Sequence, residues 1–160
     1  IPPPAPELSV TGSCVVLDGV QDPGNLGSIL RTAAAVGVAD VLLAPGCAQA
    51  WSPRVLRAAM GAHFGLRIFE NVDAQAVLAG FSGAILAADL QDSVELYELD
   101  LRGPVAWLFG SEGQGLSSAM VALATQRVLI PMPGGMESLN VGVAAGVCLF
   151  EQLRQQRSLG

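Results

Sequence analysis

The sequence predicts an α/β fold in which a mainly parallel β-sheet is covered by helices on both faces. The chain has 160 residues, of which 51% are hydrophobic and only 14% are charged, a balance typical of one domain with a full buried core. Short apolar runs alternate with segments of helical spacing, and glycine or proline separates many of them. Strands that alternate with helices indicate parallel pairing, because each helix returns the chain to the same end of the sheet.

Short apolar runs with the length of strands recur along the chain. They comprise residues 14–18, 40–44, 67–69, 84–88, 105–109 and 127–130. The turn Asp18-Gly19 closes the first run. In such sheets ligands bind beyond the carboxyl ends of the strands, so the segments after Asp18, Phe109 and Ile130 are candidate binding loops.

Helical signals occupy most of the remaining segments. They comprise residues 26–36, 53–60, 73–79, 117–124 and 138–156. In the first of them Leu26, Ile29, Leu30 and Ala33 share one face, and Gly37 is placed to cap the C-terminus. The N-terminal signals of the other four are Pro53, Asp73, Ser117 and Ser138.

The first half of the last predicted helix is apolar nearly all the way round. Leu139, Val143, Val147, Phe150 and Leu153 form one stripe. The remaining apolar positions are Val141, Ala144, Ala145, Cys148 and Leu149. A helix that is apolar on every side is buried on every side, and in so small a chain a second subunit is the natural cover. We therefore expect a homodimer.

Charge and composition exclude several classes of protein. The net charge is −6 with a pI near 4.5, and every basic side chain is an arginine, so the domain does not resemble a free-standing nucleic-acid binder. No apolar run is long enough to span a membrane, and no secretory signal is visible. The three cysteines lie far apart and His63 is the single histidine, which argues against a disulfide framework or a metal site and fits a reduced, cytoplasmic protein.

Three segments at strand ends combine glycines with polar side chains. They are Asp22-Pro-Gly-Asn25-Leu-Gly-Ser-Ile-Leu-Arg31-Thr-Ala, Leu108-Phe-Gly-Ser-Glu112-Gly-Gln-Gly-Leu-Ser117 and Ile130-Pro-Met-Pro-Gly-Gly-Met-Glu-Ser138-Leu-Asn140-Val. Each has an ordinary structural explanation: Asn25 could cap a helix, Arg31 could be a solvated helical arginine, and the glycines could form turns. The glycine spacing fits neither the dinucleotide fingerprint nor the P-loop.

In this order the segments resemble the three signature motifs of the SpoU (TrmH-type) family of RNA 2'-O-ribose methyltransferases. The similarity covers residues 14–152, and three ordered motifs are far more specific than one. Gln114 stands where the family often has arginine, and Gly142 where it often has serine or another small residue. The resemblance implies the SPOUT fold, whose parallel α/β sheet ends in a C-terminal trefoil knot. It also implies a homodimer that binds S-adenosylmethionine in the knot.

The resemblance further implies roles for individual residues. The expected catalytic residues are Arg31, Asn25, Glu112, Ser138 and Asn140. The expected cofactor contacts, made through the backbone, are Gly110, Ile130, Met132 and Leu139. Arg31, Arg54 and Arg57 are expected to bind RNA, and no metal is expected. The family picture makes Arg31 either a base or a phosphate clamp, and the clamp is physically easier because a guanidinium keeps its proton.

The domain organisation and the target follow from the same resemblance. Residues 1–12 are interpreted as a Pro-rich linker from an upstream substrate-binding domain, and residues 13–160 as the methyltransferase catalytic domain. Such an upstream domain would explain why the catalytic domain is acidic. We expect ribosomal RNA as the target. A transfer RNA target and a catalytically silent, dimeric RNA-binding module stay open, whereas a Rossmann-type or flavodoxin-like enzyme is disfavoured because its phosphate loop is missing.

Overall fold

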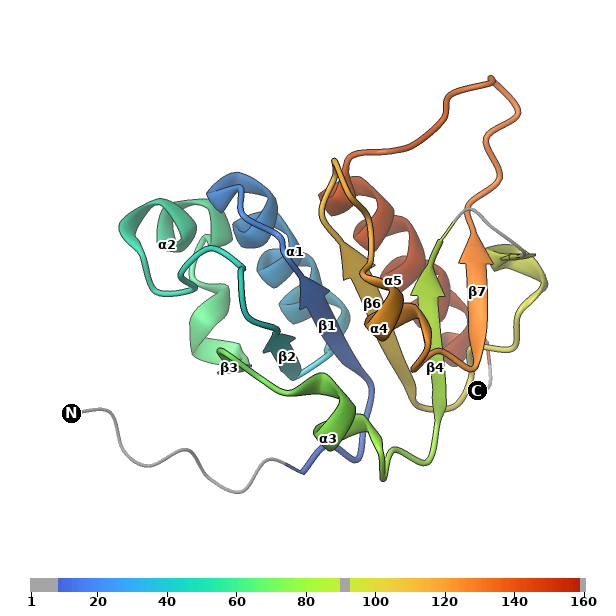
Figure 1. Cartoon of the computed structure of the whole chain (residues 1–160), viewed down its shortest axis with the longest axis horizontal. Coiled ribbons are helices and arrows are strands. Elements are labelled where there is room, and N and C mark those ends of the chain that lie inside the picture. Colours follow the sequence, from blue (N-terminus) through green and yellow to red (C-terminus); the bar gives the residue numbers. More distant parts are fainter. Residues whose placement is uncertain (1–8, 90–92, 159–160) are drawn as a thin grey trace.

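The structure is a computed structural model that describes residues 9–89 and 93–158 (Figure 1). Its strands are β1 Cys14–Asp18, β2 Asp40–Leu43, β3 Arg67–Phe69, β4 Ala84–Ala88, β5 Val94–Glu95, β6 Val105–Gly110 and β7 Gln126–Leu129. Its α-helices are α1 Pro23–Val36, α2 Pro53–Ala59, α3 Ala74–Leu78, α4 Ser118–Val121 and α5 Val141–Arg157. Two short 3₁₀ helices, η1 Ala62–Gly65 and η2 Leu96–Glu98, complete it. Most of the predicted linker, residues 1–12, lies outside the described residues.

The strands form one sheet in the order β3-β2-β1-β6-β4-β7-β5, and every neighbouring pair is parallel. The predicted α/β class with a mainly parallel sheet is therefore confirmed. The arrowheads of β1, β4, β6 and β7 all point to the upper edge of Figure 1. The chain leaves β1 in one direction through β2 and β3, whereas β6 lies on its other side, so connections diverge between β1 and β6 at this edge.

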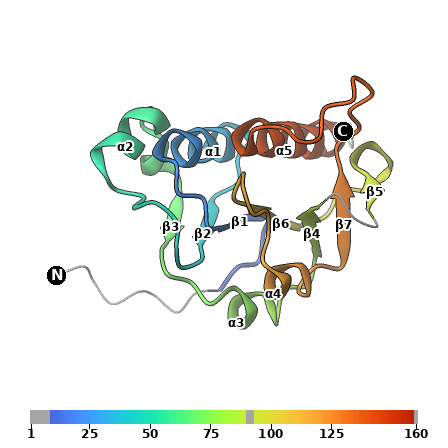
Figure 2. The ribbon, with the colours of Figure 1, turned by 45° about the horizontal axis from the view of Figure 1, so that its top comes forward.

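Helices cover both faces of the sheet, as expected. Figure 2 shows α1, α2 and α5 above it and α3 and α4 below it. Alternate residues of β1 serve the two layers: Val15 and Leu17 pack with the core under α1 and α5, and Cys14 and Val16 pack with the core that holds α3 and α4. Strands buried on both faces explain why these runs are apolar without alternation.

Two helix starts differ from the prediction because other side chains cap them. Asp22 caps α1 by accepting from the backbone N–H groups of Gly24 and Asn25 at 2.8 and 3.1 Å, so α1 begins before Leu26 and Asn25 lies inside it. Asn140 caps α5, which begins at Val141, so the predicted cap at Ser138 is wrong. The predicted caps Asp73 and Ser117 and the C-terminal Gly37, with φ of 85°, are confirmed.

Gly27 lets α1 and α2 approach closely. A Cβ at this position would overlap the Cβ of Ala58 and lie 3.0 Å from the backbone nitrogen of Ala59. The glycine of the first motif therefore has a packing role, because it sets the distance between these helices. Arg31 follows one turn later on the same side of α1, so the close contact places it toward α2.

The long helix α5 has one buried and one open side. Ala145, Cys148 and Leu149 are fully buried, whereas Val143 and Phe150 of the predicted stripe are each 52% exposed. The two faces differ although both are apolar, because only one packs against α1 and the sheet. None of the described helices is long and apolar enough to cross a membrane.

Candidate active site at the carboxyl edge of the sheet

The three motif segments converge at the carboxyl edge of the sheet. The first follows β1, the second follows β6, which pairs with β1, and the third connects β7 to α5. In Figure 1 the hairpin after β6 and the long loop after β7 both rise above the strand arrowheads. Segments far apart in the sequence thus meet where a ligand of a parallel sheet binds.

A hydrogen-bonded triad joins the three segments. The Glu112 Oε1 atom accepts from Asn25 Nδ2 and from Asn140 Nδ2, both at 2.8 Å. Asn140 Nδ2 also approaches Asn25 Oδ1 at 3.0 Å. A carboxylate that accepts from two amides makes charge-assisted bonds, which are stronger than neutral ones. The motifs are therefore tied together through side chains, and we call Asn25, Glu112 and Asn140 the amide–carboxylate triad.

Asn140 performs two tasks with the two ends of its amide. Its Oδ1 accepts from the backbone N–H groups of Gly142 and Val143 at 2.9 and 3.2 Å, which caps α5. Its Nδ2 is left to reach the triad. Asparagine is required because a serine cap offers no second amide and an aspartate cap would place a carboxylate beside Glu112.

Glycines shape the second motif into a tight hairpin. The backbone N–H of Gly115 donates to the Ser111 carbonyl at 2.8 Å, and Gly115 has a φ of 67°, in the left-handed region. A Cβ on Gly110 would overlap the backbone of Gly115 and Leu116. Gly110 therefore has to be glycine for the hairpin to close over the end of β6, which places Glu112 at the triad.

Two cavities lie on either side of Glu112, which lines both of them. The first, of about 460 Å³, is lined by all four predicted cofactor residues, Gly110, Ile130, Met132 and Leu139. Ser138 and Glu112 also line it, together with the apolar Val128 and Ala144. The second, of about 540 Å³, is lined by Asn25, Glu112, Asp22 and the segment after β1. Both volumes lie in the range of small-molecule sites.

The predicted catalytic residues do not all lie together. The triad brings Asn25, Glu112 and Asn140 into contact, and Ser138 lines the first cavity. Arg31 is exposed on α1, lines neither cavity, and has no hydrogen bond or ion pair among the described residues. Its expected role stays a prediction. Arg54 and Arg57 are exposed on α2, likewise without a partner in the described part of the chain.

Sequence reasoning did not single out Glu137, which lines the first cavity, or Asp18, which lines the second. Asp18, the last residue of β1, accepts from the backbone N–H of Ser117 at 2.8 Å and lines the second cavity. This bond ties the far end of the second motif to the first strand. Its position at a strand end was the available signal, but the pair Asp18-Gly19 is also an ordinary turn sequence.

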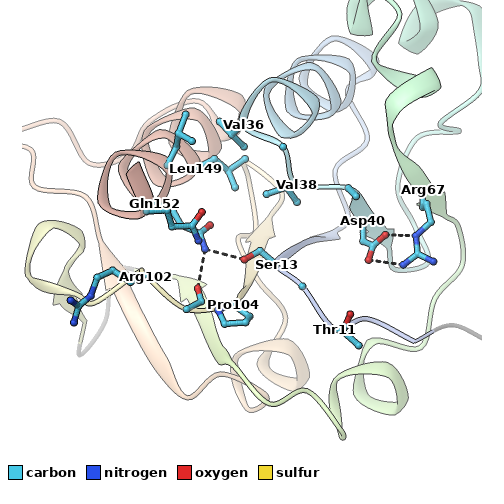
Figure 3. Close-up of a pocket in the computed structure, with 16 residues that line it drawn as sticks. Thr11, Ser13, Val36, Val38, Asp40, Arg67, Arg102, Pro104, Leu149 and Gln152 are labelled. Carbon is cyan, nitrogen blue, oxygen red and sulfur yellow. Dashed lines mark hydrogen bonds and ion pairs between the residues drawn. The ribbon is translucent and has the colours of Figure 1, made fainter. Parts of the chain in front are cut away.

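A third cavity, of about 500 Å³, lies at the opposite edge of the sheet (Figure 3). Its polar groups bond to one another: Gln152 donates to the Ser13 hydroxyl at 3.0 Å and accepts from the buried Trp107 indole at 2.9 Å. Asp40 and Arg67 form a bidentate pair at 2.6 and 2.8 Å, which raises the pKa of Arg67. None of the motif residues lies there, so this edge stabilises the fold.

The remaining titratable candidates are structural. His63 is buried, and its Nε2 lies 2.6 Å from the Ala50 carbonyl. Burial raises the pKa of the Cys14 and Cys148 thiols to about 12, with Asp40 adding to the effect at Cys14, so neither is a nucleophile near neutral pH. Among the described residues, no group of three or more metal-ligating side chains gathers.

Comparison with known proteins identifies the family. Residues 12–150 match the sequence profile of the SpoU rRNA Methylase family. The chain belongs to this family. A tRNA/rRNA methyltransferase of Synechocystis, itself uncharacterized, is 42% identical over 97% of this chain and 56% of its own length. The 23S rRNA (guanosine-2'-O-)-methyltransferase RlmB of Xylella fastidiosa is 42% identical over 89% of this chain and 58% of its own.

Solved structures agree with that assignment. The SpoU methyltransferase AviRb of Streptomyces viridochromogenes, in complex with AdoMet, has a TM-score of 0.85 at 30% identity and covers 94% of this chain and 63% of its own. An AdoMet-bound rRNA methyltransferase of Sinorhizobium meliloti has a TM-score of 0.84 at 34% identity and covers 89% and 56%. The chain spans about half the length of the curated relatives that it matches.

The two tasks of Asn140 can be separated by substitution. Asn140→Ala removes the cap of α5, which alone should lower the free energy of unfolding by about 1 kcal/mol. Asn140→Ser keeps a capping oxygen and should lose about 1 kcal/mol less than Asn140→Ala, because both variants lose the triad bonds and only Asn140→Ala loses the cap. Urea unfolding followed by circular dichroism measures both. Equal losses in the two variants would contradict the assignment of the cap to the Asn140 side chain.

Proposed function

We propose that this chain is the catalytic domain of an S-adenosylmethionine-dependent methyltransferase that acts on a ribose 2'-hydroxyl of RNA. The observation that carries the proposal is the triad, which lies between a cavity lined by every predicted cofactor residue and a second cavity beside it. Two adjoining cavities suit a reaction between two reactants held in line. Membership of the SpoU family and AdoMet-bound structural relatives support the same chemistry.

The first cavity has the chemistry expected of an S-adenosylmethionine site. Ile130, Leu139 and Val128 offer an apolar surface for the adenosine, and Gly110 lines the same cavity. The carboxylates of Glu112 and Glu137 in its lining favour a cationic ligand. When bound, the cofactor supplies a methyl group on a positively charged sulfur.

The chain itself contributes positioning more than proton chemistry. The two amides of the triad fix the orientation of Glu112, which lines both cavities. Ser138 adds a hydroxyl to the cofactor cavity. Arg31 has a free guanidinium among the described residues and in the proposal clamps an RNA phosphate beside the target ribose. A nearby cation lowers the pKa of the hydroxyl, and the proton that is released when its oxygen bonds to the methyl group passes to solvent water.

Ribosomal RNA is the proposed target. Several relatives are named as rRNA methyltransferases, including the RlmB enzymes and a mitochondrial protein of mouse that is 34% identical over 89% of this chain and 46% of its own. The relatives are longer than this chain, and an acidic domain with a net charge of −6 attracts RNA weakly. The proposal therefore assigns part of RNA recognition to segments outside residues 13–160. We also propose that the C-terminal part of the domain forms the trefoil knot and that the protein is cytoplasmic.

The cofactor cavity can be tested through the glycines of the hairpin that borders it. Gly110→Ala should weaken binding of S-adenosylhomocysteine by roughly ten- to hundred-fold, because the added methyl pushes the hairpin away from β6. Gly113→Ala is the matched control in the same hairpin, since its Cβ would meet nothing within 4 Å. Calorimetric titration measures both. Failure of the parent chain to bind at one site per subunit would overturn the proposed function.

The proposed role of Arg31 as a phosphate clamp can be tested by substitution. In the full-length protein, Arg31→Ala should lower methyl transfer to a large-subunit ribosomal RNA transcript by roughly 100-fold while leaving S-adenosylhomocysteine affinity unchanged. Arg157→Ala removes another exposed arginine, at the far end of α5, and should have little effect. Transfer of labelled methyl groups measures activity. Full activity of Arg31→Ala would refute the clamp, and methylation of a transfer RNA transcript alone would redirect the target.

The proposed homodimer can be tested at the exposed apolar stripe of α5. The open stripe of α5, with Val143 and Phe150 both half exposed, is the proposed subunit interface. Phe150→Glu should therefore convert a dimer into a monomer, because it buries a charge at the interface. Tyr97→Glu is the control, since Tyr97 is equally exposed but lies in η2 beside β5. Light scattering at micromolar concentration decides, and a monomeric parent chain would contradict the dimer.

A further inference from the structure

A second open surface is formed by α2, η1 and the loop that precedes α2, and the residues that define it line neither cavity. Phe64 is 97% exposed and Trp51 is 56% exposed, which is unusual for aromatic side chains of this size. Arg54 and Arg57 lie between them in the sequence and are exposed on α2. We call Trp51, Arg54, Arg57 and Phe64 the aromatic–arginine surface. Exposed aromatic groups that flank unpaired arginines in the sequence mark a binding surface more than a packing defect.

The arginines of the chain are divided unevenly between structure and surface. Four of the eight pair with carboxylates: Arg67, Arg102, Arg127 and Arg154. Within the described residues, the arginines without a carboxylate partner are Arg31, Arg54, Arg57 and Arg157. Three of these four belong to α1 and α2, which pack together. An acidic chain thus concentrates its available positive charge on one pair of helices.

The position of Trp51 is fixed by contacts of its ring and of the preceding residue. The His63 ring lies 4.7 Å from the Trp51 indole at a tilt of 55°, and His63 is itself fixed to the Ala50 carbonyl. The backbone N–H of Ala50 donates to Glu70 at 3.2 Å. These contacts anchor the residue before Trp51 at both its N–H and its carbonyl. The indole is therefore positioned in advance and still open, which lowers the entropy lost when a flat ligand stacks on it.

The surface connects to the candidate active site. The loop from β2 to α2 is bonded to β1 and to the segment after it, because Cys47 Sγ donates to the Leu17 carbonyl at 3.4 Å and the Ala48 N–H to the Val20 carbonyl at 2.9 Å. Val20 and Gly46 both line the second cavity. In Figures 1 and 2, α1 lies between α2 and α5, so this surface is separate from the proposed dimer stripe.

We infer that the aromatic–arginine surface binds RNA next to the target nucleotide. Unpaired bases stack on Trp51 and Phe64, and the intervening phosphates pair with Arg54 and Arg57. The inference rests on the proposed function and narrows its substrate to a single-stranded or splayed segment, because bases within a duplex offer no free faces. In a two-fold contact this surface would face the same arginines of a second copy, so charge favours RNA as its occupant.

The chain carries its own reporter for this contact. Trp107, its other tryptophan, is fully buried and donates to Gln152, so quenching of tryptophan fluorescence reports on Trp51. A short single-stranded oligoribonucleotide of mixed sequence should quench the emission at low salt. The same strand annealed to its complement should quench it weakly. Trp51→Phe should abolish the signal while leaving the buried emission of Trp107 intact.

Matched substitutions separate stacking from charge. Trp51→Ala and Phe64→Ala should each weaken binding of the single strand by roughly five- to hundred-fold, measured by fluorescence anisotropy of labelled RNA. Tyr97→Ala, which removes an exposed aromatic beside β5 at the other edge of the sheet, should not. Arg54→Ala should reduce the salt dependence of log Kd by about 0.7, and Arg157→Ala should leave it unchanged.

The outcomes distinguish this inference from the proposed function. Equal quenching by duplex and single strand, or equal losses in Tyr97→Ala, would overturn the stacking surface. Dissociation of a dimer by Trp51→Ala with Phe64→Ala in light scattering would assign the surface to a subunit contact instead. If the parent chain binds S-adenosylhomocysteine but none of these variants changes the RNA affinity, the inference alone is wrong. If the parent chain does not bind S-adenosylhomocysteine, the proposed function is wrong.

Discussion

The site depends on one carboxylate that accepts hydrogen bonds from two side-chain amides. Glu112 Oε1 is 2.8 Å from the side-chain nitrogens of both Asn25 and Asn140, so three chain segments share a single acceptor atom. The bond from the backbone N–H of Ser117 to Asp18, at 2.8 Å, adds a second tie between the first strand and the second motif. Because Asn140 also caps α5, the start of the longest helix and the arrangement of the motifs are coupled. The cavities on either side take their shape from this junction.

Glycines make that junction possible by letting backbones approach. Gly27 brings α1 against α2, and Gly110 lets its hairpin fold back over β6. Neither position has a positive φ, so the requirement is space and not conformational freedom. The glycines and the polar residues of the motifs therefore act together. The glycines allow the backbones to approach, and this approach brings the two amides within hydrogen-bonding distance of the carboxylate.

The two edges of the sheet divide stability from chemistry. At the amino edge Ser13, Gln152 and Trp107 bond to one another, and Asp40 pairs with Arg67, so the polar groups are satisfied internally. At the carboxyl edge the cavities are open and their polar groups are exposed.

The sequence alone determined the order and class of the elements, since apolar runs and helical spacing are local, and ordered motifs indicated the family. It did not predict β5, which has two residues, or the starts of α1 and α5, because Asp22, Asn25, Ser138 and Asn140 are all plausible caps. Only the tertiary structure decided which motif residues touch. Asn25 and Glu112 are 87 positions apart, and their bond depends on the pairing of β1 with β6, which no local pattern encodes.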